Sequence, residues 1–296
     1  TPMLPVDVVN EAMKQLISLS DSNVVIYNTT TEKEGMVYST EASLKKAYDD
    51  ARAEKIEAYV DNVKQEPLIA EQPKAGKIVS EKENAKFGYK ELTLSNGARV
   101  LLKKTNLKEG EVLFNGSSKG GKSLYDAKER VNLDLFNAVI SYSGLGNFSS
   151  TELQKVLAGK NANVNLSLAN LHEYVSGSCT PKDMETMFQM NYLYFTNIKK
   201  DEQAFNSLIN QYRAALKNKS LSAESALQDS LTYTLHAHDA RQISLEEKDL
   251  DNANYDRILQ IAKERTANAA DFTFTIVGNF DETLVRQYIE TYIASL

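Results

Sequence analysis

A strict alternation of apolar and polar residues at 162–168 constrains the fold more than any other feature of the chain. The apolar members are Ala162, Val164, Leu166 and Leu168, and the polar residues between them are Asn163, Asn165 and Ser167. Because successive side chains of a β-strand point to opposite faces, this period of two predicts a strand that is buried on one face only. The chain turns after Asn170 and returns through 174–179, which predicts a hairpin.

A second hairpin is predicted at 89–104, where the Asn96-Gly97 turn joins two runs of strand-forming residues. Short strands are also predicted near 111–115 and 272–277. Helical periodicity and capping residues predict helices near 126–143, 149–158, 182–195, 201–218, 221–236 and 252–266, and a last helix after Asp281. Hairpins mixed with runs of helices are typical of an α+β fold, with a mostly antiparallel sheet and helices packed on one face.

The 296 residues divide into three predicted regions. Residues 1–37 are interpreted as the closing helix and strand (24–27) of a preceding domain, and 38–85 as a charged linker with one helix near 41–59. Residues 86–296 are expected to form the globular domain. Because the chain opens at Thr1 rather than Met, we expect it to be a fragment of a longer protein.

Charge and composition exclude several kinds of partner. The net charge of -6 disfavours nucleic acid and anionic membranes, which bind basic surfaces. No apolar run approaches the roughly 18 residues of a membrane span. With Cys179 as the one cysteine, the chain has no internal disulfide and no cysteine-based metal cluster.

The stretch from Gly116 to Ser123, GSSKGGKS, matches the phosphate-binding loop G-x-x-x-x-G-K-[ST]. In such a loop Lys122 would contact the terminal phosphates and Ser123 a magnesium ion. The context disagrees, because the preceding strands form a hairpin and the next helix starts nearer Asp126. Residues 116–120 also match G-x-S-x-G, but no later histidine is marked as the base of a nucleophile elbow. Nucleotide binding stays an alternative.

Other residues with reactive side chains have structural interpretations. His236, His238 and Asp239 could ligate a metal, but at the end of a helix the two imidazoles are expected to diverge. His172 is expected at the surface of a hairpin turn, and Cys179 in the core. Core packing also accounts for Met184, Met187, Phe188 and Met190.

Three segments together resemble the pitrilysin/insulinase-type zinc metallopeptidases. ELTLSNGARVLLKK is similar to the opening hairpin of a domain in that family, and LAGKNANVNLSLANLHEYVSGSCTPKDMETMFQMNYLYFTN to its central hairpin and following helix. DFTFTIVGNFDETLVRQYIETYIASL resembles the closing strand and helix. The resemblance covers about 86–296 and implies a fold like that of pitrilysin and the mitochondrial processing peptidase.

The family's active domain carries H-x-x-E-H on the helix after the Gly-rich strand exit, where two histidines bind zinc and the glutamate activates water. That helix has no histidine here, and the equivalent positions fall near Leu135, Ala138 and Val139. The family's third zinc ligand, a glutamate, would stand within 205–220, which has no carboxylate. The resemblance therefore implies an inactive, degenerate domain with no catalytic or metal-binding residues, and its substrate-binding residues stay unidentified.

From the resemblance we expect a non-catalytic peptidase-like domain, the first domain of the C-terminal half of a zinc metalloendopeptidase. It would form the wall of the peptide chamber opposite the zinc site. No cofactor is expected in this chain, since zinc would be bound by the catalytic half of the same polypeptide. That half and a peptide substrate are the expected partners, and the resemblance suggests a periplasmic or cell-envelope location. A structural role in the assembly of a larger complex is the main alternative.

Overall fold

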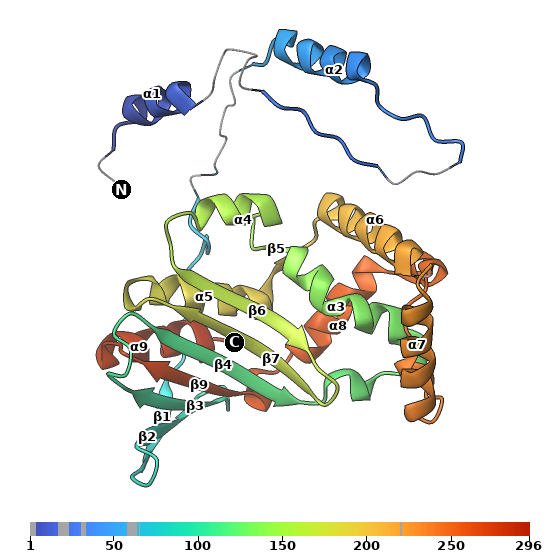
Figure 1. Cartoon of the computed structure of the whole chain (residues 1–296). Helices are drawn as coiled ribbons and strands as arrows, with labels where there is room; N and C mark the ends of the chain where they lie inside the picture. Colours follow the sequence, from blue (N-terminus) through green and yellow to red (C-terminus); the bar gives the residue numbers. More distant parts are fainter. Residues whose placement is uncertain (1–3, 17–23, 31–33, 58–63, 65, 220) are drawn as a thin grey trace. The chain divides into compact units, whose positions relative to one another are not determined.

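A computed structural model describes residues 4–16, 24–30, 34–57, 64, 66–219 and 221–296. Parts of the predicted helix and strand at 5–28 (residues 17–23), the end of the predicted helix at 41–59 (residues 58–59) and several connecting residues, residue 220 among them, lie outside these ranges. By their internal contacts the residues form two units, Thr1–Asp61 and Asn62–Leu296. Each unit is described by itself (Figure 1).

The first unit contains two helices, α1 (Val6–Leu16) and α2 (Glu41–Ala53), and neither has a buried residue. The Thr40 side chain caps α2 by accepting a hydrogen bond from the Ser43 N–H. The strand predicted at 24–27 is wrong for this chain, because residues 24–30 form no regular structure. Val25 is 90% exposed. A strand needs a neighbour to pair its main-chain groups, and no described residue pairs with this segment.

The second unit is built on a seven-stranded sheet with the order β1-β2-β3-β9-β4-β7-β6. Its strands are β1 (Ile78–Asn84), β2 (Tyr89–Leu94), β3 (Arg99–Lys104), β4 (Val112–Lys119), β6 (Ala162–Leu168), β7 (His172–Cys179) and β9 (Thr273–Gly278). All neighbours are antiparallel except β3 and β9. Both predicted hairpins are present, and Gly97 has the positive φ of 89° that its turn requires.

The sheet begins earlier in the sequence than expected. β1 lies inside the predicted linker 38–85 and pairs with β2. Leu68 and Ile69, also in that region, are buried in the core of the second unit. Residues 78–84 are densely charged. Such a sequence is compatible with a linker and equally with an edge strand whose side chains are mostly exposed. The domain boundaries themselves stay predictions.

The helices of the second unit match the predicted segments to within a few residues. They are α3 (Arg130–Tyr142), α4 (Ser150–Val156), α5 (Met184–Thr196), α6 (Glu202–Lys219), α7 (Ala223–Leu235), α8 (Tyr255–Arg265) and α9 (Glu282–Tyr288), which continues as a π-helical turn (Ile289–Ile293). Short 3-10 turns lie at Gly121–Leu124, Ala127–Glu129, Pro181–Asp183, Ala240–Gln242, Glu247–Asn252 and Ala269–Asp271. Two short strands, β5 (Gly144–Leu145) and β8 (Ile198–Lys199), pair with each other. A capping box at Ser149 starts α4, and a cap at Asp281 starts α9.

One face of the sheet is covered by helices and forms the core (Figure 1). Leu166, Val175, Phe114 and Ile276 point to this face from neighbouring strands and are buried. The opposite face has Asn165, Ser176, Asn115 and Thr275 side by side across four strands, and none of them is buried. The predicted α+β architecture, with a mostly antiparallel sheet and helices on one face, is confirmed.

Candidate functional site

The helix on which the resemblance would place the zinc ligands is α3, and its inward face is part of the core. Leu135 is fully buried and Val139 is 1% exposed. Ala138, the third position of interest, is half-buried and packs against the same core. Apolar side chains supply no metal ligand, and burial leaves no open position for a substrate.

The tertiary structure does bring α6 against α3, as a metal centre shared by the two helices would require. The inward side chains of α6, however, are apolar: Leu208 is buried, and Phe205 and Tyr212 are partly buried against the core. Across the described part of the chain, no group of three or more His, Cys, Asp or Glu residues could hold a metal ion. These residues do not fit a zinc ion.

The first half of the glycine-rich stretch that matches a phosphate-binding loop is β-strand, and most of the second half is a 3-10 turn. Residues 116–119 belong to β4, which pairs with β7 on one side and β9 on the other. A Cβ at Gly116 would lie 2.7 Å from a ring carbon of Phe274, so this glycine allows close packing inside the sheet. Ser118, the candidate nucleophile of the G-x-S-x-G match, is only 5% exposed. It is a strand residue and not the exposed tip of a turn.

The main-chain N–H groups after the strand already have partners from the β6–β7 turn. Gly120, Lys122 and Ser123 donate to the carbonyl oxygens of residues 171, 169 and 170, at 2.8, 2.8 and 2.9 Å. The Gly121 N–H donates to the Glu173 carboxylate at 2.7 Å. Glu173 is 1% exposed and lies 3.7 Å from the Arg265 guanidinium. A buried carboxylate thus occupies the position that a phosphate would need.

The two side chains of the motif are also engaged. The Lys122 ammonium pairs with Asp134 of α3 at 3.0 Å, and the Ser123 hydroxyl donates to the Gly120 carbonyl at 2.6 Å. A Cβ at Gly121 would lie 2.3 Å from the Ala169 carbonyl oxygen, so glycine is required for this close approach. The sequence pattern therefore comes from a tight strand exit, and these contacts disfavour nucleotide binding.

The histidine cluster is spread over separate contacts. A ring nitrogen of His236 lies 2.7 Å from the Thr232 carbonyl oxygen, and His238 packs against the Tyr233 ring at 4.6 Å between centroids. Asp239 accepts hydrogen bonds from Arg241, which hold the pKa of its carboxyl below the usual range. Each side chain interacts with its own neighbour, which agrees with the expectation of diverging imidazoles.

The remaining residues considered from the sequence are structural. Cys179 is buried. Its burial, and to a smaller extent the negative charge of Asp183, raise the pKa of its thiol to about 12. His172 is half-buried on the open face of β7, where its ring packs near Tyr174. The side chains of Met184, Met187, Phe188 and Met190 all lie in the core.

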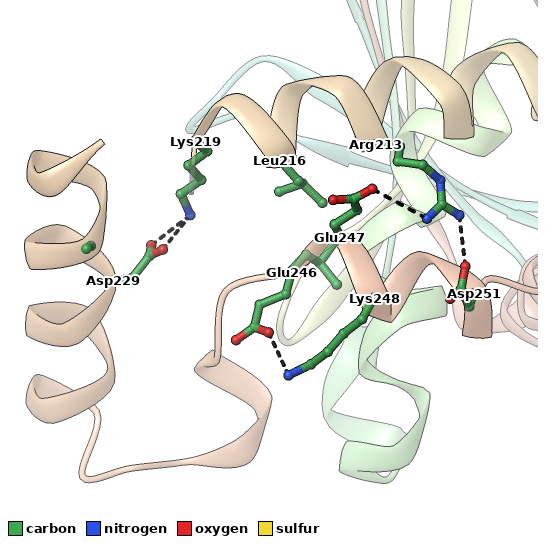
Figure 2. A pocket seen from close by; sticks show the side chains of 10 residues that line it. Arg213, Leu216, Lys219, Asp229, Glu246, Glu247, Lys248 and Asp251 are labelled. Atoms are coloured by element: carbon green, nitrogen blue, oxygen red, sulfur yellow. Dashed lines mark hydrogen bonds and ion pairs between the residues drawn. The ribbon is translucent and has the colours of Figure 1, made fainter. Parts of the chain in front are cut away.

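A groove of about 630 Å³ lies between α6, α7 and the turn Glu247–Asn252 (Figure 2). Its charged side chains pair with one another: Lys219 with Asp229 at 2.7 Å, and Arg213 with Asp251 at 2.9 Å. Lys219 holds the pKa of the Asp229 carboxyl below the usual range. Each charged side chain drawn in Figure 2 has an opposite partner within the groove, and Arg213 pairs with both Glu247 and Asp251, so these charges are already engaged with one another.

The free edge of β6 is a candidate binding feature that no sequence motif indicated. The N–H of Leu168 donates to the Asn137 side chain at 2.7 Å, and the Leu168 carbonyl accepts from the same amide at 3.3 Å. The main-chain groups of Leu168 therefore point away from β7. Since hydrogen-bonding direction alternates along an antiparallel strand, those of Val164 and Leu166 point the same way. They have no hydrogen-bond partner within the described ranges.

No family model matches the chain. It is 25% identical over 272 residues to the probable zinc protease PqqL of Escherichia coli, covering 92% of this chain and 29% of that protein. It is 22% identical over 246 residues to a zinc protease PQQL-like protein of Arabidopsis thaliana, covering 78% and 22% of the two chains. The chain thus spans less than a third of the length of these curated relatives.

Solved structures give the same result. The crystal structure of the periplasmic protease PqqL from Escherichia coli superposes with a TM-score of 0.70 at 25% identity, over 87% of this chain and 28% of that one. A peptidase M16 inactive domain from Pseudomonas fluorescens superposes with a TM-score of 0.55 at 13% identity, over 71% and 51% of the two chains. The pitrilysin-type resemblance is confirmed: the chain is homologous to the C-terminal half of PqqL-type zinc proteases and has the fold of an M16 inactive domain.

Proposed function

We propose that this peptidase-like domain is non-catalytic and forms the wall of a peptide chamber opposite the zinc site of a zinc metalloendopeptidase. The α3 face supports the first part of the proposal. Its three ligand-equivalent positions hold Leu135, Ala138 and Val139, and two of these are core residues. The domain would contribute to the rate by holding a peptide in position and not through its own chemistry.

The free edge of β6 carries the peptide-binding part of the proposal. Unpaired main-chain groups at a sheet edge can accept an extended peptide as an additional strand. The Asn137 side chain shows that an amide group can pair with this edge. It donates a hydrogen bond to the Leu168 carbonyl and accepts one from the Leu168 N–H, as a peptide group of an added strand would. The other edge strand, β1, has a register irregularity between Ile78 and Ser80 and a run of charged residues, two features that oppose strand addition.

The expected partners follow from this role. The catalytic half of the same polypeptide would bind the zinc ion, and an extended peptide would lie between the two halves. The name of the Escherichia coli relative, a periplasmic protease, supports a periplasmic location for the parent protein. No helix in the described ranges is long and apolar enough to cross a membrane.

Peptide binding can be tested at Val164. The Val164→Pro variant removes one outward N–H and leaves the β6–β7 hydrogen bonds in place, because proline is tolerated at a strand edge whose N–H faces solvent. Val164→Ala is the matched control, since it changes the side chain and keeps the N–H. We expect Val164→Pro to bind a labelled, unstructured 12- to 15-residue peptide about tenfold more weakly by fluorescence anisotropy. Val164→Ala should bind nearly as tightly as the unmodified chain.

Equal affinity of the two variants would contradict binding at the β6 edge, provided that circular dichroism shows both to be folded. Metal analysis and a peptidase assay on the 296-residue chain test the proposal that this domain is non-catalytic. Stoichiometric zinc or peptide cleavage by this chain would overturn the non-catalytic assignment. Absence of peptide binding at millimolar concentration would favour the alternative of a structural domain in a larger complex.

A further inference from the structure

Helix α7 presents an apolar stripe that the described part of its own domain leaves exposed. Leu227, Leu231 and Leu235 are 70%, 46% and 73% exposed. They are spaced four residues apart, so they lie on one side of the helix. The helix has no buried residue at all, although it spans thirteen residues from Ala223 to Leu235 and is capped by Ser222. Most helices of globular domains are stabilised by burying such a stripe.

The leucines do not lie on the side of α7 that faces the domain. Asp229 points from α7 toward Lys219 of α6 across the groove described above (Figure 2). At roughly 100° of rotation per residue, Leu231 lies about 160° around the helix from Asp229. The charged, self-paired side of α7 therefore faces the domain, and the leucine stripe faces away from it. Figure 1 shows α7 at the end of the domain farthest from β1.

We propose that the leucine stripe of α7 docks onto an apolar patch with a basic rim on another domain of the parent polypeptide. Two observations select this partner. The homologous PqqL-type proteins contain more than three times the length of this chain, so further domains adjoin this fold in them. The sequence of α7 has no basic residue, and Glu224, about 140° around the helix from the paired Asp229, gives the leucine side a negative charge, which matches a basic rim.

The same observations disfavour other occupants. Three leucines on one helix fall well short of the roughly 800 Å² per partner that a stable complex between free chains buries, which argues against a second copy. A tethered domain needs less area, because the linker keeps it at an effective concentration in the millimolar range. A membrane surface would require lysine or arginine on the polar side of the helix, and α7 has neither.

Hydrogen–deuterium exchange measured on the parent protein and on the 296-residue chain tests this inference. We expect the amides of 223–235 to exchange at least about tenfold more slowly in the parent protein, because docking suppresses local opening of α7. The paired substitution Leu227→Glu and Leu231→Glu should abolish this protection. Ser225→Glu, which lies at least about 120° around the helix from both substituted leucines, is the matched control and should retain it.

The leucines are exposed, so the paired substitution should leave the circular dichroism and thermal midpoint of the 296-residue chain unchanged. Equal exchange of 223–235 in the two proteins would overturn the inference. Protection that increases with the concentration of the 296-residue chain alone would also overturn it, in favour of a second copy. The inference depends on the chain being one domain of a longer polypeptide. It does not depend on peptide binding, and the exchange measurement contains no peptide.

Discussion

Replacing Leu135 by histidine tests whether the α3 face is core or a vacant metal site. Leu135 is fully buried and occupies a position where the resemblance would place a zinc ligand. Truncating a buried leucine costs about 2–5 kcal/mol, and a buried imidazole without a hydrogen-bond partner adds about 1–3 kcal/mol. Because the imidazole refills part of the cavity, we expect Leu135→His to lower the free energy of unfolding by about 3–5 kcal/mol.

The assay is urea unfolding followed by circular dichroism, analysed by linear extrapolation. With a slope of about 2–3 kcal/mol/M, the expected loss moves the midpoint by about 1–2 M. Ser141→His is the matched control, because Ser141 is an exposed residue of the same helix and the change should cost less than about 0.5 kcal/mol. A Leu135→His variant as stable as the control, or one whose stability is restored by zinc, would refute the assignment of this face to the core.

Three further predictions concern single side chains. Glu173→Ala leaves the Gly121 N–H and the Arg265 guanidinium without their carboxylate and should cost about 3–5 kcal/mol in urea unfolding. Glu173→Gln, which keeps an acceptor, should cost less, and equal losses would contradict this account. Cys179, whose thiol pKa is raised to about 12, should react with a thiol reagent at pH 8 only after unfolding; rapid labelling of the native protein would show that the site opens. For Glu152, hydrogen bonds from the Ser149 N–H and from Lys64 lower the carboxyl pKa from 4.5 to about 2. The resulting stabilisation is present above pH 4.5 and is lost as the pH falls toward 2, so Glu152→Gln should reduce the acid sensitivity of the urea midpoint in that window. An unchanged acid sensitivity would contradict this assignment.

The local elements of the second unit could be predicted from the sequence because local side-chain patterns determine them. The alternation at 162–168 is strand β6, the Asn96-Gly97 dipeptide is the turn between β2 and β3, and Asp281 is the cap of α9. The helix without histidine was also identified from the sequence, and it is α3. Where the local pattern was ambiguous, the prediction failed: charged residues 78–84 form an edge strand, and apolar residues 24–27 form none.

The glycine-rich stretch shows why the candidate sites needed the tertiary structure. Residues 116–123 match a phosphate-binding loop by their order alone. Whether their N–H groups are available depends on the β6–β7 turn, about fifty residues later, which supplies the carbonyl groups and the Glu173 carboxylate that occupy them. No local pattern specifies such partners, because they are set by the pairing of β4 with β7.

The sequence by itself determined the types of element, their approximate limits and the absence of histidine from one helix. Only the tertiary structure decided that β9 inserts between β3 and β4, that β6 is left with a free edge, and that the leucines of α7 remain exposed. The physical reason is that the period of two or 3.6 residues specifies which side chains share a face of an element. The partner of that face is chosen by long-range burial and hydrogen bonding, which involve residues far apart in the chain.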